Sequence, residues 1–341
     1  MDMRTQPAQE FHVIPGAFIA ETLAGQQDTI VDVVMDAYLR HHAGRTINPD
    51  SYFLRFDDKP SARIIALPAA IKGDAAIAGI KWIASFPDNA GINLQRASAT
   101  LVLNDYETGY PIALLEASQI SAARTAASCV LAADVLGGGR RMRCLAVVGA
   151  GVIARTIVDY LRAGDWAIDE LVVHALSAED AEHLATMACG FCAEVRVAGS
   201  AEDAIRGASH AVLATTAPAP YLHAADLLAP GQIVLNISLR DLAPELLLGA
   251  FNVFDDIEHC MKASTSPHLA EQLTGGRAFV HGVLAEVIEG TLPVDRTKPI
   301  VFSPFGLGIL DLAVGRYLLE RARAQDRAVG IDGFFPDVSR W

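Results

Sequence analysis

The chain has 341 residues, a length typical of two domains. Apolar residues make up 52% and charged residues 20%, so the chain can bury a large core and is not generally disordered. The formal net charge of −13 argues against nonspecific binding to nucleic acid or to an anionic membrane, because both require clustered Lys and Arg.

The first residues, MDMRTQPAQEF, contain no apolar stretch of the kind found in a signal peptide. We identify no apolar run with the length of a membrane-spanning helix. Five scattered cysteines are typical of a reducing compartment. We therefore expect a cytoplasmic protein with no membrane partner and no nucleic-acid partner.

The first third of the chain has the pattern of an α+β domain. Residues 30–38 carry apolar side chains at helical spacing. Short runs typical of strands follow, namely YFLRF, RIIALPA, AIAGIKWIASF and ATLVLND. The segment NDYETGYP (104–111) is typical of a turn, and IALLEA continues as a strand, so we expect a mostly antiparallel sheet. An alanine-rich helix over 121–136 ends at three glycines, 137–139.

The segment CLAVVGAGVIA, residues 144–154, is the most informative part of the chain. Four apolar residues (145–148) predict a buried strand, and helical spacing resumes at Val152. Between them, Gly149, Gly151 and Ala154 form G-x-G-x-x-A. The first glycine permits a tight turn, the second lets backbone N–H groups approach a pyrophosphate, and the alanine permits close helix packing. The segment therefore predicts a dinucleotide-binding βαβ unit.

Strand and helix patterns alternate after this turn. The expected strands are LVVHAL, AEVRVA, AVLATT, QIVLNIS and NVFDD, and a helix is expected over 178–188. Such alternation predicts a doubly wound parallel sheet of the Rossmann type, and a long amphipathic helix follows at 309–324. Cys189 and Cys192 form a C-G-F-C pair that lacks a second half-site, so we expect a structural role and no metal site.

The residue that usually separates NAD from NADP is missing from its expected place. A carboxylate on the ribose 2′-hydroxyl is expected at the end of the second strand, about 20 residues after the glycines. His174 occupies that place, with neither an acid nor an arginine beside it. Two interpretations stay open: His174 contacts the ribose, or it only caps the strand.

Four basic residues lie in apolar surroundings. Lys81 interrupts an apolar strand, where it is either functional or an edge lysine with its ammonium in water. Arg55 and Arg63 alternate with apolar residues, and each could hold a substrate carboxylate through a bidentate fork. Arg124 lies in an alanine-rich helix, where a surface ion pair is the alternative to a functional role.

Asp241 follows the strand QIVLNIS. Catalytic groups of doubly wound sheets gather just beyond the carboxyl ends of strands, so Asp241 is placed to act as an acid or base. Because Pro244 and Glu245 follow closely, Asp241 could equally be a helix N-cap.

Five blocks of the chain resemble the ornithine cyclodeaminase/μ-crystallin superfamily. In order they are KWIASFPDN, LNDYETGYPIALLEASQISAARTAAS, VVGAGVIA, LNISLRD and VFSPFGLGILDLA. Within this superfamily, the chain looks most similar to the N-((2S)-2-amino-2-carboxyethyl)-L-glutamate dehydrogenases of 2,3-diaminopropionate biosynthesis, through the blocks FLRFDDKPSARIIALPA, IKWIASFP, LLEASQISAARTAAS, LNISLRDLAPE and FDDIEH. Cyclodeaminases usually have Gly at the position of Glu116 and a different turn at 239–241.

The resemblance implies a split fold. Residues 1–128 and 310–341 would form a substrate-binding and dimerisation domain around a Rossmann domain at 129–309, with two subunits pairing their sheets in a homodimer. Substrate carboxylates would contact Arg55, Lys81, Arg63 and Arg124, and Asp241 would handle the substrate amine. The cofactor contacts would be Arg124, Thr125, Gly149, Ala150, Gly151, Val152, Ile153, His174, Thr215, Asn236, Ser238 and Ser303.

The resemblance also implies a reaction. NAD⁺ would oxidise a small amino-acid substrate, a secondary amine joining glutamate to diaminopropionate, and hydrolysis of the imine would release 2-oxoglutarate and L-2,3-diaminopropionate, a siderophore or peptide-antibiotic precursor. The alternatives are an ornithine cyclodeaminase, another amino-acid dehydrogenase or imine reductase, and a non-catalytic μ-crystallin-like binding protein. The last has no need for Lys81, Arg124 and Asp241 together.

Overall fold

The computed structural model describes residues 10–336, which form two compact units. Of the described residues, the first unit contains 10–26, Arg40–Ser121 and 307–336, and the second contains Gln27–Leu39 and Ala122–Gly306. Most of the segment considered for a signal peptide, residues 1–9, lies outside the described residues. Helices α2 (Gln27–His42) and α3 (Ser118–Gly137) each contribute residues to both units. The boundary expected at 128/129 therefore falls inside a helix, and residues 27–39 group with the second unit instead of the first.

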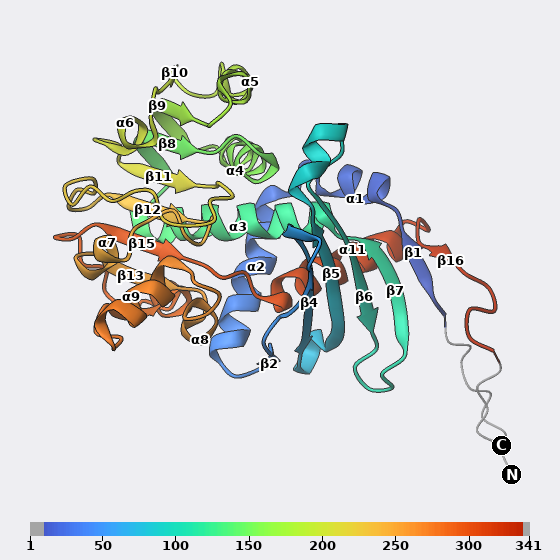
Figure 1. The fold of residues 1–341 in the computed structure, drawn as a ribbon. Coiled ribbons are helices and arrows are strands. Elements are labelled where there is room, and N and C mark those ends of the chain that lie inside the picture. The colour runs from blue at the N-terminus through green and yellow to red at the C-terminus, as the bar shows by residue number, and fades with distance from the viewer. Residues whose placement is uncertain (1–9, 337–341) are drawn as a thin grey trace, which may run out of the picture. The chain divides into compact units, whose positions relative to one another are not determined.

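The first unit contains an eight-stranded sheet (Figure 1). Its order is β16-β1-β7-β6-β5-β4-β2, and β3 also pairs with β4. Neighbouring strands are antiparallel except β1 and β7, which agrees with the sheet expected from the sequence. The strands are β1 (His12–Ile14), β2 (Thr46–Ile47), β3 (Tyr52–Phe56), β4 (Lys59–Ile71), β5 (Ile77–Ser85), β6 (Ala97–Asn104), β7 (Pro111–Glu116) and β16 (Val329–Gly330).

Helix α11 (Gly308–Ala324) covers one face of this sheet and packs on β4, β5 and β6, as Figure 1 shows. A Cβ at Gly315 would overlap the side chain of Leu101, so glycine permits the close approach of helix and sheet. Helix α1 (Gly16–Leu23) packs on α11 and β7. Because strand side chains alternate between faces, Lys81 and Leu101 point to the α11 side and Trp82 points away.

Helix α3 corrects one expectation from the sequence. From the sequence we expected no apolar run with the length of a membrane-spanning helix. The 20 residues of α3 nevertheless have that length and composition. However, 67% of its most apolar window is buried inside the protein, as in the core helix of a globular fold. The length and composition of α3 are therefore only weak evidence that it spans a membrane.

The second unit contains an eight-stranded parallel sheet of the Rossmann type, as the alternating pattern predicted. Its order is β10-β9-β8-β11-β12-β15-β13-β14. The sequence predicted neither β14 nor β15, because the four residues of β15 lie between Pro299 and Pro304 and look like a loop. The strands are β8 (Arg141–Val148), β9 (Ala167–His174), β10 (Glu194–Val197), β11 (His210–Leu213), β12 (Ile233–Asn236), β13 (Phe251–Phe254), β14 (Val280–Val283) and β15 (Ile300–Ser303).

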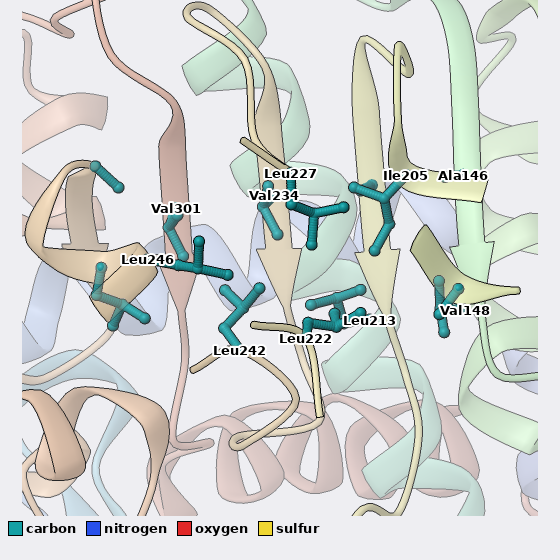
Figure 2. Close-up of a cluster of buried hydrophobic side chains, with 14 of the residues drawn as sticks. Ala146, Val148, Ile205, Leu213, Leu222, Leu227, Val234, Leu242, Leu246 and Val301 are labelled. Atoms are coloured by element: carbon teal, nitrogen blue, oxygen red, sulfur yellow. The ribbon is translucent and has the colours of Figure 1, made fainter. Parts of the chain in front are cut away.

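A buried apolar cluster holds the strands of this sheet against flanking segments (Figure 2). Leu213, Val234 and Val301 come from neighbouring strands, and Leu222 and Leu242 come from loops that form a β-bridge. These two leucines adjoin Tyr221 and Asp241, so packing fixes the loops that follow the strands. The helices are α4 (Val152–Ala163), α5 (Ala178–Ala188), α6 (Ala201–Ile205), α7 (Pro244–Leu248), α8 (Ile257–Cys260), α9 (Ser266–Thr274) and α10 (Leu284–Ile288).

Candidate active site

The glycine turn lies where the strand order reverses, since β8 has β9 on one side and β11 on the other. Gly149 has φ +103°, and a Cβ there would overlap the carbonyl oxygen of Ala214, so only glycine fits. At Gly151, by contrast, no described atom lies within 4 Å of a Cβ position. Helix α4 begins directly after Gly151, which makes no side-chain cap. This open, uncapped helix start fits the pyrophosphate of a dinucleotide.

Polar side chains line the carboxyl ends of the next strands. Asn236 ends β12 and Ser303 ends β15, and the Asn236 Nδ2 atom donates to Ser303 Oγ at 3.1 Å. The Asn236 Oδ1 atom is buried and, among residues 10–336, has no hydrogen-bond partner. Because buried polar atoms are rarely left unpaired, this oxygen is suited to accept from a ligand such as the carboxamide of a nicotinamide ring.

His174 ends β9, and its Nδ1 atom bonds to the carbonyl oxygen of Ala198 at 3.1 Å. A carbonyl can only accept, so Nδ1 carries the proton, and in the neutral ring Nε2 is then an acceptor. Ala198 follows β10 directly, so the bond joins the ends of two neighbouring strands and does not cap β9 alone. The half-buried ring keeps an acceptor nitrogen at the expected place of the ribose carboxylate.

Asp241 is fully buried and is not a helix cap, since the N-cap of α7 is Ala243. Its Oδ1 atom accepts from Thr215 Oγ1 at 2.7 Å, and its Oδ2 atom accepts from the Tyr221 hydroxyl at 3.3 Å. Burial raises the pKa of the Asp241 carboxyl, while the hydroxyls of Thr215, Ser238 and Tyr221 oppose this increase. A buried carboxylate held by hydroxyls at a strand end can take up and release a proton.

The turn that carries Asp241 is strained and clamped to a second segment. Leu239, Ala263 and Ser264 all have positive φ angles, of 74°, 55° and 54°. The Arg240 guanidinium donates to the carbonyl oxygens of Ala263 and Ser264, at 2.9 and 3.3 Å. Each such residue costs about 1–3 kcal/mol, and strain of this kind persists where surrounding contacts hold it, commonly at functional sites.

Arg124 and Thr125 lie half-buried on α3. A Cβ at Gly306 would overlap the Arg124 guanidinium, so the loop after β15 approaches this side chain closely. The sequence did not single out Asp255, which holds this loop by accepting from the backbone N–H groups of Phe305 (2.8 Å) and Gly306 (2.6 Å). In the sequence, Asp255 appears only as part of the expected strand NVFDD and of the block FDDIEH.

In the first unit, Lys81 is 1% exposed, so it is not an edge lysine with its ammonium in water. Its Nζ atom donates to Asp311 Oδ2 at 2.6 Å and to Ser121 Oγ at 3.3 Å. Asp311, on α11, is also fully buried and was not predicted from the sequence. The pair keeps a cation inside the protein without an uncompensated charge.

Arg55 and Arg63 lie directly opposite each other on β3 and β4. Arg55 is exposed and Arg63 is half-buried. Both belong to the face of the sheet that carries Lys81, so these three basic side chains, each predicted to contact substrate, share one face.

Cys189 and Cys192 are free thiols. Burial raises the pKa of the Cys192 thiol to about 11, whereas an activated cysteine has a lowered pKa.

Comparison with known proteins agrees with this architecture. The model of the ornithine cyclodeaminase/mu-crystallin family matches residues 20–326. The chain belongs to this family. It is 30% identical over 306 residues to the N-((2S)-2-amino-2-carboxyethyl)-L-glutamate dehydrogenase of Staphylococcus aureus (strain NCTC 8325 / PS 47), a match that covers 87% of this chain and 90% of that enzyme.

Two solved structures share the fold of this family member. One is the Δ1-pyrroline-2-carboxylate reductase of Thermococcus litoralis in complex with NADH and L-proline, with a TM-score of 0.85, 22% identity, and coverage of 94% of this chain and 100% of that one. The other is an archaeal alanine dehydrogenase dimer with bound NAD, with a TM-score of 0.83, 24% identity, and coverage of 95% and 100%.

Asp241 and Asp255 have different kinds of hydrogen-bond donor, so we predict opposite effects on stability when each is replaced by asparagine. Burial raises the pKa of both Asp241 and Asp255. Each of these two carboxyl groups therefore favours the folded state while it is protonated at low pH. This contribution to the free energy of unfolding is lost as the pH rises through the pKa that the group has in the folded protein. At neutral pH, Asp241→Asn should unfold at the same or a higher temperature than the wild type, because rotatable hydroxyls can accept from an amide. This margin should shrink at mildly acidic pH, where the wild-type carboxyl becomes protonated.

Asp255→Asn should destabilise the protein by about 2 kcal/mol, because each carboxylate oxygen accepts from a backbone N–H, and the NH2 group that replaces one oxygen would set a donor against a donor. Thermal and denaturant unfolding of both variants across the same pH series measures the difference. Equal losses of stability for Asp241→Asn and Asp255→Asn would contradict this interpretation.

Proposed function

We propose that this chain is an NAD-dependent dehydrogenase that oxidises N-((2S)-2-amino-2-carboxyethyl)-L-glutamate to L-2,3-diaminopropionate and 2-oxoglutarate. The observation that carries the proposal is the buried Asp241 carboxylate. It lies beyond the end of β12 and accepts hydrogen bonds from Thr215 and Tyr221. The 30% identity with the Staphylococcus aureus enzyme supports the general reaction, oxidation of an amino-acid substrate by NAD. The product would enter siderophore or peptide-antibiotic synthesis in the cytoplasm.

The geometry of the sheet edge supports the cofactor contacts that we propose. Backbone groups of residues 149–153 would hold the pyrophosphate at the start of α4. The nicotinamide would be surrounded by polar side chains from the strand ends and from α3, namely Asn236, Ser303, Ser238, Thr215, Arg124 and Thr125. Bound NAD⁺ would supply the hydride acceptor.

His174 favours NAD over NADP. Its Nε2 acceptor can bond to a ribose 2′-hydroxyl and so replace the usual carboxylate. A 2′-phosphate is itself an acceptor, so it gains no hydrogen bond from a neutral ring in this tautomer. The preference for NAD over NADP would therefore depend on the hydrogen bond from His174 Nδ1 to the carbonyl oxygen of Ala198, because this bond leaves Nε2 as an acceptor.

The chain's residues would promote oxidation in two stages. Asp241 accepts the proton of the substrate nitrogen while hydride leaves the glutamate α-carbon, and the nitrogen lone pair forms the C=N bond of an imine. Water then adds to the imine carbon, and cleavage of the C–N bond releases the amine of diaminopropionate. Lys81, Arg55, Arg63 and Arg124 would neutralise the substrate's carboxylates and orient its reacting carbon.

A second candidate is another reaction of the same family. The Thermococcus litoralis reductase and the archaeal alanine dehydrogenase share the fold, so a smaller imine or amino acid is the main competing substrate class. Ornithine cyclodeamination is a further alternative. A non-catalytic binding protein is disfavoured because it gains nothing from a buried, proton-binding Asp241.

We also propose a homodimer that covers the free face of the antiparallel sheet. Tyr52, Leu54 and Trp82 are 75%, 46% and 44% exposed and lie on the face opposite to Lys81. Large apolar side chains gathered on one sheet face are typical of a protein interface.

Turnover distinguishes these reactions directly. Purified protein with the secondary amine and NAD⁺ should produce NADH, 2-oxoglutarate and diaminopropionate in equal amounts. Asp241→Asn should lower kcat by about 100-fold or more while NAD⁺ binding stays unchanged, because only the proton acceptor is lost. Absence of turnover together with proline and ammonia from ornithine would instead identify a cyclodeaminase.

Cofactor preference tests the assignment of His174. His174→Leu should weaken NADH binding by up to about tenfold, the usual value of one hydrogen bond, and leave NADPH binding nearly unchanged. His174→Asp, which restores a carboxylate acceptor, should retain NADH binding. Fluorescence titration of both cofactors measures the two constants, and equal weakening for NADH and NADPH would exclude a ribose contact.

Oligomeric state tests the proposed interface. Trp82→Glu should shift the protein from dimer to monomer in light scattering, because a charge replaces an apolar contact at the centre of the sheet face. Leu176→Glu is the matched control, since Leu176 is fully exposed in the second unit and should not change the mass. A wild-type protein that is already monomeric would refute the proposal.

A further inference from the structure

We propose that Arg96, with Arg63 and Arg55, forms a second carboxylate-binding site on the first unit, for a substrate carboxylate that Lys81 does not contact. The inference rests on the proposed function for the identity of the substrate. Neither the sequence analysis nor the family comparison singled out Arg96. We call these three residues the arginine cluster.

Strand register brings the arginine cluster together. Arg55 is opposite Arg63 across β3 and β4, and Arg63 is opposite Ser85 across β4 and β5. Ser85 is in turn opposite Ala97, the first residue of β6. Arg96 precedes Ala97, and its Nη1 atom donates to Ser85 Oγ at 2.7 Å. Arg96 therefore contacts a buried serine that lies directly opposite Arg63 in the sheet, and Arg55 lies on the far side of Arg63.

The charges of Arg96 and Arg55 are incompletely balanced. Arg96 is half-buried, and within residues 10–336 no carboxylate forms an ion pair with Arg96 or with Arg55. Burial lowers the pKa of Arg96, with no acidic group opposing the decrease. Like charges directly opposite on neighbouring strands are also unfavourable. A bound carboxylate would relieve both costs, and guanidinium groups bind carboxylates in a bidentate geometry.

The position of the cluster suits a substrate with several carboxylates. Ser85 and Lys81 lie on the same face of β5, four residues apart, which corresponds to about 13 Å along a strand. Long arginine and lysine side chains can shorten this span from both ends. One carboxylate could then bind near Lys81 and a distal one at the arginine cluster. An amino acid with a single carboxylate would gain nothing from the second site.

The test compares Arg96→Gln with the wild type and with Arg141→Gln. Arg141 is an exposed arginine of β8 that pairs with Asp169, so it controls for the loss of a charge. The probes are glutarate, a dicarboxylate, and acetate, a monocarboxylate, each measured by calorimetry and by its effect on the melting temperature. Steady-state kinetics with the secondary amine follow for all three proteins.

We expect Arg96→Gln to weaken glutarate binding and raise the KM of the secondary amine by about tenfold or more, with kcat changed by less than about threefold. The affinity for acetate and the melting temperature without ligand should not fall, because the variant removes a half-buried charge that has no carboxylate partner among the described residues. Arg141→Gln should behave like the wild type.

Two outcomes would overturn the inference. One is unchanged glutarate binding and KM in Arg96→Gln. The other is a lower melting temperature without ligand together with equal losses for glutarate and acetate, which would indicate a structural role. Failure of the proposed function is a separate result: the wild type would not oxidise the secondary amine, yet glutarate binding would still depend on Arg96.

Discussion

The buried ion pair between Lys81 and Asp311 is the constraint on which the first unit depends. Two charges removed from water are tolerated only when they are paired and hydrogen-bonded, and here the ammonium also reaches Ser121. The partners are 230 residues apart, so the chain must complete the entire parallel sheet before α11 can supply the carboxylate. This order explains why the nucleotide-binding turn comes late in the chain, and why α11 with Gly315 belongs to the first sheet.

A second principle governs the parallel sheet, where polar groups gather at one edge with different kinds of partner. Asp255 is bound by backbone N–H groups that can only donate, so it acts as a fixed support for the loop after β15. Asp241 is bound by hydroxyls that can donate or accept, so its carboxyl can change protonation without breaking its surroundings. The same residue type is thus held by different kinds of donor at two strand ends, and the strained turn at Leu239 lies beside Asp241, for which we propose the chemical role.

Much of this architecture was predictable because the signals are local. Apolar runs and helical spacing predicted the antiparallel strands of the first unit, the helix α5 and most of the parallel strands. The place of Asp241 at the sheet edge was predictable because it follows an expected strand, and parallel strands end at one edge, whereas Asn236 was proposed from the family resemblance alone. Strand β15 was missed because two prolines flank its four residues. Asp311 was missed because a single acid in an amphipathic helix usually faces water.

The sequence by itself determined the Rossmann-type sheet, the glycine turn at Gly149 and the family, because each depends on residues close together in the chain. Only the tertiary structure decided which charges are balanced. It gave Lys81 a partner on α11, removed the cap interpretation of Asp241, and placed the Arg96 guanidinium beside Ser85, where no acid of residues 10–336 pairs with it. The reason is physical: the cost of a buried charge depends on atoms from other strands and helices, whose approach no local pattern specifies.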